Sequence, residues 1–81
     1  MDKKILVVDD AMFMRSIIRK ILKEAGYTQV WEAQDGEKAM ELFREVSPDL
    51  VLLDITMPGR SGLEVLEEML SLVPNIRVIM C

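Results

Sequence analysis

Two unbroken aliphatic runs constrain the fold more than any other feature of this sequence. The runs are residues 5–8 and 50–53, and each ends directly before an aspartate, Asp9 and Asp54. Runs of Val, Ile and Leu without polar alternation are typical of strands that are covered on both faces, as in parallel sheets. Parallel strands need long crossover connections, which are usually helices. The sequence therefore predicts an α/β fold.

Helical patterns lie between the expected strands. Apolar residues recur at helical spacing over residues 14–25, and Gly26 is placed to end that helix in a left-handed conformation. Asp35 is the candidate N-cap of a second helix, and Ser61 with Glu64 has the capping-box spacing before a third. The face that we expect the third helix to bury consists of Leu63, Leu66, Leu70 and Val73.

Two further strands complete the expected order of elements. Residues 28–33 and 77–81 are rich in Val, Ile, Trp and Met and are typical of strands. Strands that alternate with helices at this spacing indicate right-handed crossovers around a parallel sheet. We expect residues 1–81 to form one domain with a flavodoxin-like, doubly wound parallel sheet of strand order 2-1-3-4.

The composition excludes several classes of function. Fourteen acidic residues against ten basic ones give a net charge of -4, and the basic residues are scattered, which disfavours nucleic-acid binding. The absence of histidine excludes His-based triads and histidine metal sites. Cys81 is the only cysteine, and no apolar run is long enough for a signal peptide or a membrane span. The sequence therefore predicts a cytoplasmic protein without a membrane partner.

Three aspartates are expected to meet at one edge of the sheet. Asp9 and Asp10 follow the first strand and Asp54 follows the third, and ligands of open α/β sheets bind at the carboxyl ends of such strands. Carboxylates about 4 Å apart repel by roughly 4 kcal/mol at an effective dielectric near 20, so the cluster calls for protons or a cation. Oxygen ligands without His or Cys favour Mg²⁺. Taken singly, Asp10 as a helix N-cap and Asp54 as a turn residue stay open alternatives.

Four segments carry a set of motifs that covers nearly the whole chain. They are ILVVDDAMFMR, AQDGEKAME, PDLVLLDITMPGRSGLEVL and NIRVIMC. The set combines an aspartate pair after the first strand with Asp-x-x-Met-Pro-Gly after the third. In these motifs the chain resembles the receiver domains of two-component response regulators, particularly the single-domain chemotaxis regulators.

The resemblance implies a role for each residue of the acidic edge. Asp54 would be the phosphoacceptor, which attacks phosphorus and forms an aspartyl phosphate. Asp10 would bind Mg²⁺ directly, Asp9 would act largely through a bound water, and the backbone carbonyl of Thr56 would be another ligand. The Thr56 side chain would tune the lifetime of the phosphoryl group. The phosphodonor would be a histidine kinase and the output partner another protein, such as the flagellar motor, so we do not expect an enzyme that acts on a separate substrate.

The resemblance also implies parts that would lie after Cys81. Receiver domains carry a Ser or Thr beyond the fourth strand, a Lys at the end of a fifth strand, and two further helices. We therefore expect a partial receiver domain that lacks the fifth strand and the last two helices of a full one. The alternative function is that of a truncated or engineered fragment, which self-associates as a homo-oligomer through its uncovered sheet edge and has little or no phosphotransfer activity.

Overall fold

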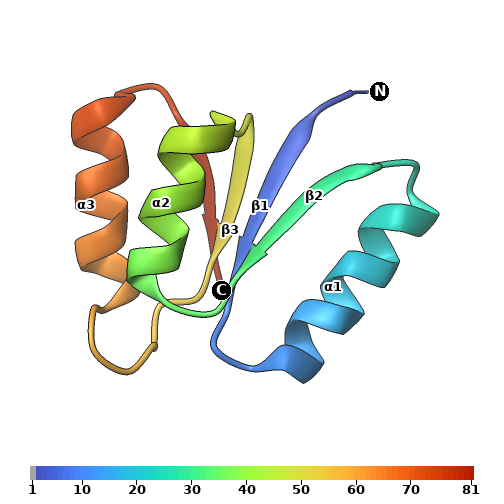
Figure 1. The fold of residues 1–81 in the computed structure, drawn as a ribbon, viewed down its shortest axis with the longest axis horizontal. Helices are drawn as coiled ribbons and strands as arrows, with labels where there is room; N and C mark the ends of the chain where they lie inside the picture. Colours follow the sequence, from blue (N-terminus) through green and yellow to red (C-terminus); the bar gives the residue numbers. More distant parts are fainter. Residues whose placement is uncertain (1) are drawn as a thin grey trace.

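The structure, a computed structural model that describes residues 2–81, contains strands and helices in the expected alternating order (Figure 1). In chain order the elements are β1 (Lys4–Val8), α1 (Met12–Glu24), β2 (Gln29–Ala33), α2 (Gly36–Val46), β3 (Leu50–Leu53), α3 (Gly62–Leu72) and β4 (Arg77–Met80).

The sheet is parallel throughout and has the order β2-β1-β3-β4, which confirms the predicted strand order. The carboxyl ends of the strands are level, because Val8 at the end of β1 is the register partner of both Ala33 and Leu53. Helix α1 covers one face of the sheet, and α2 and α3 cover the other (Figure 1). The predicted flavodoxin-like, doubly wound arrangement is therefore confirmed.

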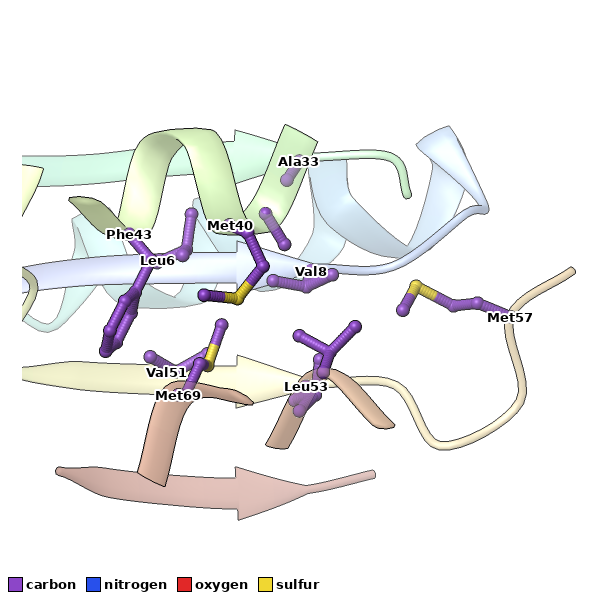
Figure 2. Packing of buried hydrophobic residues seen from close by; sticks show 11 residues of the cluster. Leu6, Val8, Ala33, Met40, Phe43, Val51, Leu53, Met57 and Met69 are labelled. Atoms are coloured by element: carbon purple, nitrogen blue, oxygen red, sulfur yellow. The ribbon is translucent and has the colours of Figure 1, made fainter. Parts of the chain in front are cut away.

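The main core lies between the sheet and the pair α2 and α3. Alternate residues of a strand point to opposite faces, so Leu6 and Val8 of β1 share this face with Val51 and Leu53 of β3 (Figure 2). The other buried members of the cluster are Ala33, Ala39, Met40, Phe43, Met57, Val65 and Met69. Because both central strands are packed in this way, their carboxyl ends are held in a fixed relation to each other.

The predicted buried face of α3 is wrong for most of its residues, although Leu66 is half-buried and packs against the core as predicted. The residues of this helix that are buried against the core are Val65 and Met69, four positions apart, whereas Leu63 is 57% exposed and Leu70 is 40% exposed. Helix α3 carries apolar residues on more than one side, so periodicity alone could not select the buried one. Contact with α2 and the sheet makes the selection.

Helix α1 packs more lightly than its apolar spacing predicts. None of its residues is fully buried, and Ile18 and Leu22 are half-buried while Ile17 and Ile21 are exposed. Among the described residues, α1 packs mainly on β1 and β2, and no second helix lies beside it on that face. Apolar side chains of α1 such as Ile17 and Ile21 therefore stay exposed.

The ends of the helices follow the sequence predictions. Gly26 has a φ of 98° after α1, the Asp35 side chain accepts a hydrogen bond from the Lys38 N–H at 2.8 Å, and Ser61 and Glu64 form the reciprocal capping box. Ser47 ends α2 with a φ of 54°, a left-handed conformation that a non-glycine residue adopts at some cost.

One carboxylate connects α2, α3 and the loop between β3 and α3. Glu68 of α3 forms ion pairs with Arg44 of α2 and with Arg60 of the loop. The hydrogen bond from Arg60 is the main cause that lowers the pKa of Glu68 below its usual value, and partial desolvation opposes this shift. The same bond raises the pKa of Arg60. The three groups fasten the loop after Asp54 to the helical layer.

We expect Glu68→Gln to lower the melting temperature by a few degrees at neutral pH and by less in acid. A lowered pKa stabilises the folded state fully above the ordinary value of 4.5, and this contribution disappears as the pH falls through the lower folded-state value. Thermal unfolding followed by circular dichroism at pH 7 and at about pH 3 measures the difference. Glu67→Gln is the matched control, because Glu67 lies at the neighbouring exposed position and takes part in neither of these ion pairs. A pH-independent loss in Glu68→Gln would contradict the prediction.

Candidate metal centre

Three carboxylates meet at the carboxyl end of the sheet, as predicted from the sequence. Asp9, Asp10 and Asp54 each offer one oxygen atom, and these atoms all lie within 4.8 Å of one another. Asp9 and Asp54 are half-buried, and Asp10 is exposed. The loops that follow β1 and β3 leave the same end of the sheet (Figure 1).

Backbone hydrogen bonds hold two of these aspartates at the rim. The Asp54 N–H donates to the Val8 carbonyl at 2.9 Å, which extends the pairing of β1 with β3 by one step. On the other side of β1, the Asp9 N–H donates to the Ala33 carbonyl at 3.1 Å. Because the sheet itself fixes their backbones, Asp9 and Asp54 lie at the rim before a ligand binds.

The loop after β1 excludes the alternative that Asp10 is only the N-cap of α1. The N-cap of α1 is Ala11, and no side chain caps this helix, so Asp10 is not an N-cap. Asp9 instead closes the turn, since its Oδ1 accepts a hydrogen bond from the Ala11 N–H at 2.9 Å. Within residues 2–81 no hydrogen bond engages the Asp10 carboxylate, which leaves both of its oxygens open to a ligand.

The loop after β3 holds the carboxylate of Asp54 in one orientation. The Thr56 N–H donates to Asp54 Oδ1 at 3.0 Å, and the Thr56 hydroxyl lies 3.4 Å from the same oxygen. Asp54 is therefore a turn residue, which was the alternative reading of this position, and it is also a member of the acidic cluster. Because these contacts use Oδ1 alone, Oδ2 stays available.

Gly62 is a residue of the site that sequence reasoning missed. A Cβ atom at this position would lie 2.1 Å from the Asp54 carbonyl oxygen and 2.8 Å from Ile55 Cα. The Gly62 N–H also donates to the Ile55 carbonyl at 3.0 Å. The start of α3 thus touches the backbone of Asp54 directly, and only glycine permits this approach. The one feature of the sequence that could have pointed to Gly62 is its position directly after the N-cap Ser61.

Arg15 is the other missed residue. Its guanidinium donates to the Asp9 carbonyl at 2.7 Å and to Glu32 at 3.1 Å. The sequence places Arg15 on the first turns of a helix, where an arginine is usually a solvated residue, and nothing in the spacing indicates its partners.

The donor atoms of the cluster suit a hard divalent cation. They are carboxylate oxygens without histidine or cysteine, which favours Mg²⁺ over Zn²⁺. Three negative groups within 4.8 Å also supply the charge that such an ion neutralises. The residues present therefore fit Mg²⁺. The proposed contribution of the Thr56 carbonyl stays a prediction.

The sheet order together with this acidic edge defines the α/β signalling domains of receiver type. The chain belongs to the family of response regulator receiver domains, whose model matches residues 5–81. No helix within residues 2–81 has the length and apolar character needed to cross a membrane.

Individual relatives agree with this assignment. The chain is 51% identical over 78 residues to protein CcdB of Bacillus subtilis and covers 96% of its own length and 65% of that protein. It is 42% identical over 81 residues to the chemotaxis protein CheY of Thermotoga maritima, of which it covers 68%. The response regulator TrrA of Thermotoga maritima, solved in complex with Mg²⁺ and BeF, superposes with a TM-score of 0.91 at 42% identity, covering 96% of this chain and 67% of that one. The chain thus spans about two thirds of the length of these relatives.

We expect Gly62→Ala to destabilise the protein by about 1–3 kcal/mol, because the new methyl group would overlap the Asp54 backbone. Urea unfolding measures the change. Gly36→Ala is the comparison, since a Cβ there would meet side-chain atoms, Arg60 Cβ and Val65 Cγ2, each at 2.9 Å, and no backbone atom, so we expect a smaller loss of stability than in Gly62→Ala. If Gly62→Ala is no less stable than Gly36→Ala, the close approach at Asp54 does not constrain the site.

Proposed function

We propose that this protein is a phosphoacceptor module of two-component signal transduction. In this proposal Asp54 receives a phosphoryl group from a phosphohistidine of a histidine kinase, with Mg²⁺ as the cofactor. The observation that carries the proposal is the meeting of Asp9, Asp10 and Asp54 within 4.8 Å at the carboxyl end of a receiver sheet.

Asp54 is the nucleophile of the proposed step. One carboxylate oxygen forms a new O–P bond while the N–P bond of the phosphohistidine breaks, and the bonding electron pair stays on the departing imidazole nitrogen. The contacts of Thr56 with Oδ1 support Oδ2 as the attacking atom, because they hold the carboxylate still and leave that oxygen uncovered. The product is an aspartyl phosphate.

Asp10, Asp54 and the Thr56 carbonyl would hold Mg²⁺ directly, and Asp9 would do so through a water. When bound, this ion neutralises the negative charge that gathers as a phosphoryl group approaches three carboxylates. Asp9 and Asp10 therefore act before the transfer, by making the acidic edge a place where an anion can approach.

Thr56 has a second proposed role after the transfer. Its hydroxyl lies 3.4 Å from Asp54 Oδ1, so Thr56 stands beside the carboxylate that would carry the phosphoryl group on Oδ2. A side chain at this place controls how easily water reaches the phosphorus, and so it would tune the lifetime of the modified state.

Chemotaxis is the process that we infer, since chemotaxis protein CheY of several organisms recurs among the relatives. The output partner would then be a protein such as the flagellar motor. The protein would not be an enzyme with a separate substrate, because the group that it transfers ends on its own Asp54. A cytoplasmic location stays a prediction from the sequence.

We expect incubation with acetyl phosphate and Mg²⁺ to add one phosphoryl group to the wild-type protein and none to Asp54→Asn, as read by intact mass. Removal of Mg²⁺ with a chelator should abolish the addition in the wild type. Asp49→Asn is the matched control, because Asp49 flanks the same strand β3 at its other end. Labelling of Asp54→Asn equal to that of the wild type would exclude Asp54 as the acceptor.

A second candidate function is self-association through the edge of the sheet. Among the described strands β4 pairs only with β3, and Ile79 of β4 is 53% exposed. An open edge beside apolar side chains favours pairing with another chain. Sedimentation with and without Mg²⁺ separates the two candidates. A monomer that is stabilised by Mg²⁺ supports the phosphoacceptor, and an oligomer that does not respond to the ion supports self-association.

A further inference from the structure

Arg15 connects the loop that carries Asp9 and Asp10 to the strand on its other side. Its side chain is only 11% exposed, although α1 as a whole is lightly packed. One guanidinium nitrogen donates to the Asp9 carbonyl at 2.7 Å, and Nε donates to Glu32 Oε1 on β2 at 3.1 Å. The guanidinium therefore bridges two separate segments through a planar group with fixed donor directions.

Glu32 holds Arg15 in place and shares its charge with a second arginine. Its other oxygen, Oε2, accepts a hydrogen bond from Arg19 at 3.1 Å, and Arg19 also donates to the Val30 carbonyl at 3.2 Å. The two arginines lie one turn apart on α1 and meet the same carboxylate. Only Arg15 reaches the loop of the acidic cluster.

We propose that Arg15 is a positioning residue for the metal site, which sets the direction of the Asp9 and Asp10 side chains through the peptide between them. This inference rests on the proposed binding of Mg²⁺ to the acidic cluster. Glu32 would support it by fixing the guanidinium against β2.

The peptide plane gives the physical reason. The carbonyl that Arg15 holds belongs to the peptide that joins Asp9 to Asp10, and a planar peptide fixes the relative placement of both Cα atoms. The other bonds of Asp9 are made by the backbone N–H of Ala11 and the backbone carbonyl of Ala33. Arg15 is thus the one side chain among the described residues that holds this peptide.

The charge of Arg15 and its proposed positioning role predict opposite effects of its loss on Mg²⁺ binding. A cation beside three carboxylates repels a second cation, so by charge alone its removal would tighten Mg²⁺ binding. If Arg15 positions the loop, its removal instead lets the peptide rotate, and Mg²⁺ binds more weakly. The sign of the change in the dissociation constant therefore distinguishes the two roles.

Titration calorimetry with Mg²⁺ on the purified wild-type protein and its variants tests the proposal, with circular dichroism to establish that each is folded. We expect Arg15→Ala to raise the dissociation constant about tenfold, as for other residues that orient metal ligands. Arg19→Ala is the matched control, because it removes the same charge and also contacts Glu32 but does not touch Asp9. It should leave the constant unchanged or slightly lower it.

An unchanged or lower dissociation constant in Arg15→Ala would overturn the proposal, and so would equal changes in Arg15→Ala and Arg19→Ala. If Arg15→Ala does not fold, Arg15→Lys is the deciding variant, because it keeps the positive charge and loses the planar guanidinium that donates to two partners at once. We expect Arg15→Lys to bind Mg²⁺ about threefold more weakly than the wild type. An affinity of Arg15→Lys equal to that of the wild type would contradict the proposal. Failure of the wild type itself to bind Mg²⁺ is a different result, which refutes the proposed cofactor and with it the role of Arg15.

Discussion

The site depends on the pairing of β1 with β3 up to their last residues. Val8 and Leu53 are register partners, and the Asp54 N–H continues the ladder by donating to the Val8 carbonyl at 2.9 Å. A slip of one residue would replace Leu6 and Val8 by Ile5 and Val7 on the face that packs against α2 and α3, so the side-chain packing of the main core depends on this register. The same register places Asp9 and Asp54 side by side. Core packing and the geometry of the acidic edge therefore follow from one constraint.

Both loops that leave this edge are held by contacts with the rest of the protein. The loop after β3 is fixed at Gly62, where α3 touches the Asp54 backbone, and at Arg60, which pairs with Glu68. The loop after β1 is held through Asp9 by its neighbours on the sheet and by Arg15. Three carboxylates repel one another, so a site of this kind needs such supports if its side chains are to stay together before a cation arrives.

The fold and the acidic cluster could be predicted from the sequence because their signals are local. Unbroken aliphatic runs mark buried parallel strands, and aspartates directly after them must reach the same rim. The buried face of α3 could not be predicted in this way, because only contact with α2 and the sheet decides which of its apolar sides is buried. Arg15 and Gly62 were missed for a related reason. Their partners, Asp9, Glu32 and Asp54, become neighbours only after the strands pair.

The most direct test of the account is a crystal structure with Mn²⁺ in place of Mg²⁺, located by its anomalous signal. We predict one ion at the carboxyl end of the sheet, about 2.1 Å from an oxygen of Asp10, an oxygen of Asp54 and the Thr56 carbonyl, with a water between the ion and Asp9. An ion that binds elsewhere, or that contacts only one of these carboxylates, would contradict the proposal that the acidic edge is the metal site.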